Sequence, residues 1–305
     1  MKVPRQTLAL AGFALLVLTW GYNWVVMKIA LDYSHALDFA ILRSLGGMLC
    51  LFLIAFVAGQ GFRLTAPWHV LLLGLVQTTG FTGLVTLGLS MEDAGKTAIL
   101  AFTMPFWVLI FAALVLGEKV RDWQWLAVAF ALGGLILLVG PWDPALRGAG
   151  SLLAIAAGAC WGASVVVAKR IPMRDRWELI PITAWQMLLG VIPLLLLLPL
   201  VERPPIDWDP VFIGALLFNI LPANALAWLF WLYLVSRLPA GVTGLNALAI
   251  PVVGMSAAWL QLGERPTTLE ATGMALILTA LAILSLRGLW LWRRKQRVME
   301  ARKSP

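Results

Sequence analysis

The sequence predicts an all-α polytopic membrane protein whose ten transmembrane helices form two inverted repeats of five. Three observations predict it: the composition, the number of long apolar runs, and a set of motifs that occurs twice. Hydrophobic residues make up 61% of the 305 residues and charged residues 12%, which leaves too few polar side chains to cover a soluble globule. Trp outnumbers Tyr by sixteen to three, as is typical of membrane interfaces, where Trp is enriched.

Ten apolar runs are each long enough for a helix to cross the bilayer, which takes about 20 residues. In order they are 8–28, 38–58, 68–90, 95–116, 123–140, 149–169, 178–200, 210–235, 240–262 and 268–290. Charged or turn-forming residues separate them at 32–38, 60–63, 92–93, 118–122, 141–148, 170–176, 202–209, 237–239 and 264–266. The basic segment before the first run shows no small-residue cleavage site, so we expect a retained first span.

The basic residues predict which side each loop faces, because Lys and Arg are retained on the cytoplasmic side. With the N-terminus inside, the inner segments, Arg287 and the basic tail at 291–305 together hold 17 Lys and Arg residues, and the outer segments hold five. Both termini are therefore expected in the cytoplasm. The net charge of +8 comes from these scattered topology signals, so no nucleic-acid partner is expected.

Two sets of motifs divide the chain into two units, 8–140 and 149–290. The stretch at 20–28 (WGYNWVVMK) aligns with 161–169 (WGASVVVAK), and Ala94-Gly95, Pro105 and Gly117-Glu118-Lys119 align with Ala240-Gly241, Pro251 and Gly263-Glu264-Arg265. Each unit holds five spans, and an odd number makes the second unit insert upside down relative to the first. Inverted repeats with interrupted helices are typical of transporters, in which the substrate binds near the midplane between the halves.

The paired Trp-Gly…Lys starts and the paired Pro…Gly-Glu ends resemble the EamA branch of the drug/metabolite transporter superfamily. The resemblance covers about 9–139 and 150–287. It implies ten helices, a pseudo-two-fold axis in the membrane plane, alternating access, and a cavity lined by helices 1, 3, 4, 6, 8 and 9. Within this branch the chain is similar to bacterial exporters of amino acids, including aromatic amino acids, and this resemblance implies the bacterial inner membrane.

Polar residues inside the spans are expected to face a cavity, because they are costly against lipid. In the third span, Thr78, Thr82 and Thr86 are four residues apart and share one helix face, next to Gln77 and Gly80. We interpret this face as a wet, flexible wall of the substrate path. The alternative is a Thr face that packs against a neighbouring helix.

Prolines break three spans at positions suited to movement. Pro105 and Pro251 each remove a backbone hydrogen bond deep in repeat-related helices, and we expect paired hinges there, with static kinks as the alternative. Asn219, Pro222 and Asn224 predict a similar break in the eighth span. Two amides at this depth are hard to explain as lipid-facing.

Tryptophans within spans can stack on an aromatic substrate and close it off from water, although ordinary packing is the simpler explanation for any one of them. Trp161 is the strongest candidate, because it belongs to the repeated motif and Ser164 follows three residues later. The predicted cavity residues are Gln77, Thr78, Phe81, Thr82, Phe102, Trp161, Ser164, Trp185, Asn219, Asn224, Thr243 and Asn246, with hinges at Gly80, Pro105, Pro222 and Pro251 and gates at Lys28 and Lys169.

The charged residues near the spans have competing explanations. Lys28 and Lys169 end repeat-related helices on opposite sides of the membrane. As gates they would engage a carboxylate on the passing substrate, whereas the alternative is snorkelling into the headgroups. Arg43, inside the second span, is explained by a partner such as Asp38 or by snorkelling. Glu264 is expected to cap the turn after the ninth helix.

The positions of the ionisable residues predict the mode of transport. All 15 Asp and Glu residues and both His residues lie in loops or near helix ends. A proton relay needs an ionisable group at depth, so facilitated diffusion is expected, with no cofactor and no metal. The inferred pocket is neutral, made of amides, hydroxyls and rings, and suits a zwitterion with an apolar or aromatic side chain.

Other substrates and other classes of protein remain as alternatives. Nucleosides, vitamins or drugs could use the same rings and amides. An intramembrane enzyme would need paired aspartates, a His-rich metal site or a Ser nucleophile with its base, and we expect no enzymatic activity. A channel, a lipid flippase and a non-transporting scaffold complete the alternatives. The expected partners are the lipid bilayer and a small-molecule substrate, and a monomer is compatible with a chain that encloses its own repeat.

Overall fold

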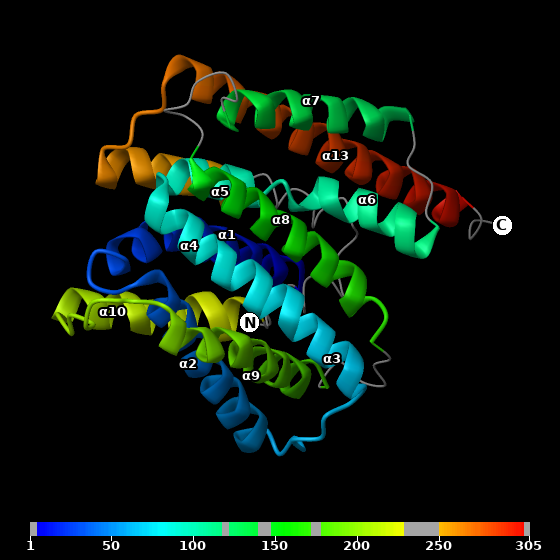
Figure 1. The fold of residues 1–305 in the computed structure, drawn as a ribbon. Helices are drawn as coiled ribbons and strands as arrows, with labels where there is room; N and C mark the ends of the chain where they lie inside the picture. The colour runs from blue at the N-terminus through cyan, green and yellow to red at the C-terminus, as the bar shows by residue number, and fades with distance from the viewer. Residues whose placement is uncertain (1–4, 118–121, 140–147, 172–177, 229–249, 302–305) are drawn as a thin grey trace.

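The structure, a computed structural model, describes residues 5–117, 122–139, 148–171, 178–228 and 250–301 (Figure 1). The helices of the first half are α1 (Arg5–Ala30), α2 (Ala36–Val57), α3 (Pro67–Gly74), α4 (Leu84–Met91), α5 (Ala94–Ala101), α6 (Met104–Leu116) and α7 (Asp122–Val139). Those of the second half are α8 (Ala149–Ala168), α9 (Leu179–Leu197), α10 (Pro210–Phe218), a helix at 250–257, and α13 (Thr268–Ala301). The described ranges contain no strand.

Five helical stretches are long and apolar enough to cross a membrane: Ala36–Val57, Pro67–Met91, Ala94–Val115, Ala149–Ala168 and Leu179–Leu200. Shorter apolar helices fall on the other predicted spans, at Ala14–Ala30, Trp123–Val139, Pro210–Leu226, Ile250–Leu262 and Thr268–Leu284. The predicted helical membrane fold is therefore confirmed, with five clear spans. The total of ten remains a prediction.

Several spans are not continuous α-helices. Segment η1 (Leu75–Gly83), which joins α3 to α4, is π-helical, and so are η4 (Asn219–Leu226), which follows α10, and η5 (Ala258–Leu262). A π turn takes in an extra residue, and such turns are frequent at functional sites. In the fourth span, Phe102 and Thr103 leave the helix between α5 and α6, just before Pro105. Apart from η5, these irregular segments coincide with the polar and proline-containing stretches of the sequence.

The helices pack in pairs that bring distant parts of the chain together. In Figure 1, α7 lies along α13; α2 packs on α9, α8 on α4 and α6, and α1 on α10. Glycines allow the closest approaches: a Cβ added at Gly74 would lie 2.6 Å from the carbonyl oxygen of Gln186, and one at Gly134 would lie 2.6 Å from that of Gly273. Small residues at such crossings let helix backbones touch, as is usual inside membranes.

Candidate functional site

An aromatic cluster occupies the centre of the bundle, where irregular segments of several spans meet. It consists of Trp20 and Trp24 from α1, Phe81 from η1, Phe102 from the α5–α6 break, Trp161 from α8 and Trp228 beyond η4. The Trp161 ring centroid lies 4.9 Å from that of Phe81 and 5.2 Å from that of Phe102. It also lies 6.2 Å from Trp20 and 6.4 Å from Trp228, so Trp161 is the hub of the cluster.

Two small cavities adjoin this cluster, and Trp161 and Trp228 line both of them. The first cavity, of about 50 Å³, reaches from the cluster to α1 and α2. The second cavity, of about 100 Å³, lies between η1, α8 and α9. Sites for small-molecule ligands usually measure roughly 300–1,000 Å³. Both cavities are therefore contracted, and a ligand of ordinary size requires the surrounding helices to move apart.

Hydrogen-bonding side chains from three segments surround the second cavity. The Ser164 hydroxyl donates to Oε1 of Gln77 at 2.5 Å, and the Thr78 hydroxyl donates to Oε1 of Gln186 at 3.1 Å. Nε2 of Gln77 is buried and has no acceptor among the described residues. Because an unmet buried N–H is costly, this position favours a polar ligand or a water molecule. Gln186 was not among the predicted residues, although it too is a polar residue within a span and is costly against lipid.

The first cavity is not neutral, because Arg43 lines it. The Arg43 side chain is 8% exposed, so it does not snorkel to the surface. Asp38, its expected partner, instead accepts a hydrogen bond from Nη1 of Arg203 at 2.7 Å. Both sequence-based explanations of Arg43 are thus wrong. The available signal was its place inside an apolar run, where a charge is costly.

Five predicted cavity residues line at least one of the two cavities: Gln77, Phe81, Phe102, Trp161 and Ser164. Thr78 is buried and lines neither cavity, and its hydroxyl donates to Gln186. The Thr82 hydroxyl donates to the backbone carbonyl of Gln77 at 3.4 Å. The structure therefore gathers these residues in one place, and their contact with a substrate remains a prediction.

Trp185 lines neither of the two cavities, and its role in substrate binding remains a prediction. Its indole N–H donates to the backbone carbonyl of Phe62 at 2.9 Å, and its ring packs on Phe52 at 5.4 Å. The physical reason is the helix period of 3.6 residues. Thr183 and Gln186 of α9 face the second cavity, and their neighbour Trp185 consequently points in another direction.

The two amides of the eighth span serve the backbone. Nδ2 of Asn219 donates to the carbonyl of Ala215 in its own helix at 3.1 Å. Nδ2 of Asn224 donates to the backbone carbonyl of Arg43 at 2.9 Å and so holds α2 against η4. Neither residue lines the two central cavities, and their role in substrate binding remains a prediction. Thr243 and Asn246 lie outside the described residues.

The four predicted hinges occupy irregular or closely packed places. Gly80 lies in η1, Pro222 in η4, Pro105 beside the α5–α6 break, and Pro251, which is buried, in the helix at 250–257. A Cβ at Gly80 would lie 2.8 Å from Sγ of Cys160 on α8. Hinge motion at these positions remains a prediction.

The two predicted gate lysines differ in their surroundings. Nζ of Lys28 donates to the backbone carbonyls of Leu89 at 2.9 Å and Glu92 at 2.7 Å. It thus satisfies carbonyls at the C-terminal end of α4, a position that favours a cation. Lys169 is exposed just after α8. A gating role for either residue remains a prediction.

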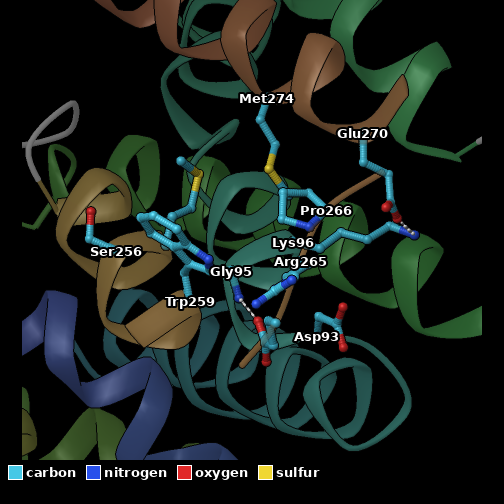
Figure 2. Close-up of a pocket in the computed structure, with 11 residues that line it drawn as sticks. Asp93, Gly95, Lys96, Ser256, Trp259, Arg265, Pro266, Glu270 and Met274 are labelled. Carbon is cyan, nitrogen blue, oxygen red and sulfur yellow. Dashed lines mark hydrogen bonds and ion pairs between the residues drawn. The ribbon is translucent and has the colours of Figure 1, made fainter. Parts of the chain in front are cut away.

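The charged residues at the Lys28 end of the bundle form a network beside a pocket of about 370 Å³ (Figure 2). Lys96, 5% exposed, lies between the carboxylates of Glu92 at 3.2 Å and Glu270 at 3.4 Å. Glu264 accepts hydrogen bonds from the backbone N–H groups of Ala94 at 2.7 Å and Gly95 at 2.9 Å. Glu264 therefore caps α5. The sequence had instead predicted that it caps the turn after the ninth helix.

This contact joins two of the repeated motifs, Ala94-Gly95 of the first unit and Gly263-Glu264-Arg265 of the second. A carboxylate at a helix N-terminus is favoured, because the first N–H groups of a helix lack partners within it. The hydrogen bonds of Glu264 to Ala94 and Gly95 hold the fourth span against the loop before α13. Within the described part of the chain, no group of three or more His, Cys, Asp or Glu side chains is placed to hold a metal ion.

Apolar helices that break around a polar and aromatic centre are the architecture of a multi-pass membrane transporter. The chain matches the model of the EamA-like transporter family over residues 7–140 and 148–286, and it belongs to that family. The resemblance seen in the motifs is thereby confirmed.

Relatives of known description are similar along nearly their whole length. A probable amino-acid metabolite efflux pump of Salmonella typhimurium is 28% identical over 284 residues, with 88% of this chain and 92% of the relative covered. A riboflavin transporter of Rhizobium johnstonii is 29% identical over 276 residues, with 90% and 87% covered. One crystal structure superposes with a TM-score of 0.65 at 20% identity, covering 92% of this chain and 98% of the other, which shows a shared fold.

Proposed function

We propose that this transporter exports neutral and aromatic amino acids from the bacterial cytoplasm through the central cavities by alternating access. The observation that carries the proposal is the aromatic cluster centred on Trp161, with unmet hydrogen-bonding groups in both adjoining cavities. Rings supply stacking surface for an apolar or aromatic side chain. Gln77 and its neighbours supply polar contacts. The similarity to an amino-acid metabolite efflux pump supports this class of substrate.

The proposed topology has ten spans in two inverted units, 8–140 and 149–290, with both termini and the basic tail at 291–305 in the cytoplasm. The packing supports a two-fold relation between the units. The first span, α1, contacts η4 and η5 of the eighth and ninth spans, as the sixth span, α8, contacts the third and fourth. The second span pairs with the seventh, and the fifth pairs with the tenth. Exchanging the halves leaves this pattern unchanged.

In this topology the Lys28 end of the bundle faces the periplasm. The Lys96 ion pairs and the Glu264 cap hold the fourth, ninth and tenth spans together there. The contracted cavities and this closed end fit a state in which substrate has no exit to the outside. Release then requires the network to open, and alternating access follows from opening and closing it in turn.

Transport without ion coupling is part of the proposal. Neither central cavity is lined by an Asp, Glu or His residue among the described residues. Among the described residues, Arg43 is the charged residue that lines either cavity, and a guanidinium does not release its proton in proteins. Because a proton relay needs a group that titrates, the substrate gradient is left as the driving force.

A second candidate substrate class has one specific observation in its favour. The riboflavin transporter of Rhizobium johnstonii is as similar to this chain as the amino-acid pump is. A planar heterocycle would also stack on the rings of Trp20 and Trp161. The experiment below separates the two classes.

The test is uptake of radiolabelled phenylalanine, leucine and riboflavin into proteoliposomes of the purified protein, without an ion gradient. We expect saturable uptake of the two amino acids, reduced at least tenfold by Trp161→Ala and less by Trp161→Phe. Trp68→Ala is the matched control, because Trp68 is 79% exposed at the start of α3. Uptake of riboflavin alone, or equal activity of Trp161→Ala and the control, would contradict the proposal.

A further inference from the structure

The first cavity contains a cation without a counter-ion. Among the described residues, no carboxylate lies within 4.0 Å of the Arg43 guanidinium. Nη1 of Arg43 faces Sδ of Met27 at 2.6 Å, and Cζ lies 5.9 Å from the centre of the Phe39 ring. A thioether is a weak acceptor and a distant ring a weak partner. Nε is buried and has no acceptor in the described part of the chain.

This arrangement is unfavourable unless an anion completes it. The guanidinium stays charged, and a buried charge without a partner is far more costly than a buried neutral group. The carboxylate nearest along α2 is that of Asp38, which already pairs with Arg203 at 2.7 Å. An anion that enters the cavity would supply the missing partner. Arg suits a carboxylate especially, because its planar fork matches the two oxygens.

The same cavity offers an unused acceptor on the opposite helix. Asn23 of α1 lines the cavity and is 6% exposed, and its Oδ1 has no donor among the described residues. Asn23 precedes Met27 by four residues and so lies on the same face of α1. Because Met27 touches Arg43, α1 holds the free acceptor close to the free cation. A ligand with both an anionic and a cationic group would satisfy both.

We infer that Arg43 binds the carboxylate and Asn23 the ammonium group of an α-amino acid whose side chain packs on the aromatic cluster. The inference rests on the proposed function and deepens it, since it assigns the groups that recognise the zwitterion. The substrate carboxylate neutralises Arg43. The ammonium group meets Oδ1 of Asn23 and the ring faces of Trp20 and Trp24, which attract a cation. A heterocycle without a carboxylate would leave Arg43 unpaired and should therefore bind less tightly than an α-amino acid.

The experiment is isothermal titration calorimetry of the purified protein with L-phenylalanine, L-phenylalaninamide and 3-phenylpropionate. The amide lacks the carboxylate and the propionate lacks the ammonium group. Wild-type protein should bind L-phenylalanine about ten- to a hundredfold more tightly than either analogue, as expected for loss of a charge-assisted contact. Arg43→Gln should bind L-phenylalanine and its amide with similar, weak affinity. Asn23→Leu should instead abolish the preference for L-phenylalanine over 3-phenylpropionate.

Two further variants separate recognition from folding. Arg43→Lys keeps the charge without the fork and should retain a reduced preference for the carboxylate. Arg203→Gln, the matched control outside the cavity, should discriminate as the wild type does. Wild-type protein that binds the amide as tightly as L-phenylalanine, or an Arg43→Gln variant with full discrimination, would overturn the inference while leaving amino-acid transport standing. Wild-type protein that binds neither L-phenylalanine, L-leucine nor L-tryptophan would overturn the proposed function as well.

Discussion

Replacing Glu264 by Gln tests how the Lys28 end of the bundle is held shut. The two carboxylate oxygens accept the N–H groups of Ala94 at 2.7 Å and Gly95 at 2.9 Å. The amide keeps one oxygen, turns an NH2 group toward the second donor, and removes the charge that favours a helix N-terminus. The loss of one charge-assisted bond, about 1.5–3 kcal/mol, and of the charge at the helix end, about 0.3–1 kcal/mol, suggests roughly 2 kcal/mol for this half-buried site.

The closed arrangement should therefore lose about 2 kcal/mol relative to the open one, which is about a thirtyfold shift in the equilibrium. Ala98, on α5 and fully buried, provides the reporter. In a background with Cys50 and Cys160 replaced by alanine, Ala98→Cys should react with a membrane-impermeant maleimide slowly. The same protein with Glu264→Gln should react about thirtyfold faster, as long as the open form stays in the minority.

Asp93→Asn is the matched control for this prediction. Asp93 lines the same pocket and directly precedes α5, but its side chain makes no capping hydrogen bond to that helix. The substitution removes the same charge from the same place and should leave the labelling rate close to that of the parent. An unchanged rate in Glu264→Gln, or an equal rise in Asp93→Asn, would refute the role of the Glu264 cap.

Two further predictions concern stability, measured as thermal unfolding in detergent. Gly190→Ala should destabilise the protein by about 1–3 kcal/mol, because the new Cβ would collide with the carbonyl of Gly74. Gly214→Ala, the same change where nothing lies within 4 Å, should be neutral or slightly stabilising, and equal effects would refute the packing explanation. Lys96→Met should lower stability by a few kcal/mol, because it leaves Glu92 and Glu270 without their buried cation. Adding Glu270→Gln should recover part of the loss, and strictly additive losses would contradict the proposed network.

The local patterns of the sequence predicted the parts of the site that depend on one helix at a time. The repeated motif and the polar stretch of the third span selected Trp161, Ser164 and Gln77, which the structure brings together. Helical spacing alone could not show which face of α9 is turned toward the cavity. Trp185 was therefore chosen in place of its neighbour Gln186, although only Gln186 lines the second cavity.

Contacts between distant segments were beyond what spacing predicts. Asp38 and Arg43 are five residues apart, which suggested a pair, yet Asp38 binds Arg203 from a loop 165 residues away. Glu264 was assigned to its own turn and instead caps a helix that begins 170 residues earlier. In both cases the partner is selected by the packing of the two halves, which one sequence without its fold does not reveal. The sequence therefore predicted a neutral pocket, whereas the first cavity contains the cation of Arg43.

The most direct test of amino-acid transport without ion coupling is counterflow in proteoliposomes. Vesicles preloaded with unlabelled L-phenylalanine are diluted into a trace of the radiolabelled compound, with ionophores present to remove proton and sodium gradients. We predict transient accumulation of label above the external concentration, and none in vesicles preloaded with riboflavin. Accumulation that requires a proton gradient, or that riboflavin alone supports, would contradict a facilitative amino-acid exporter.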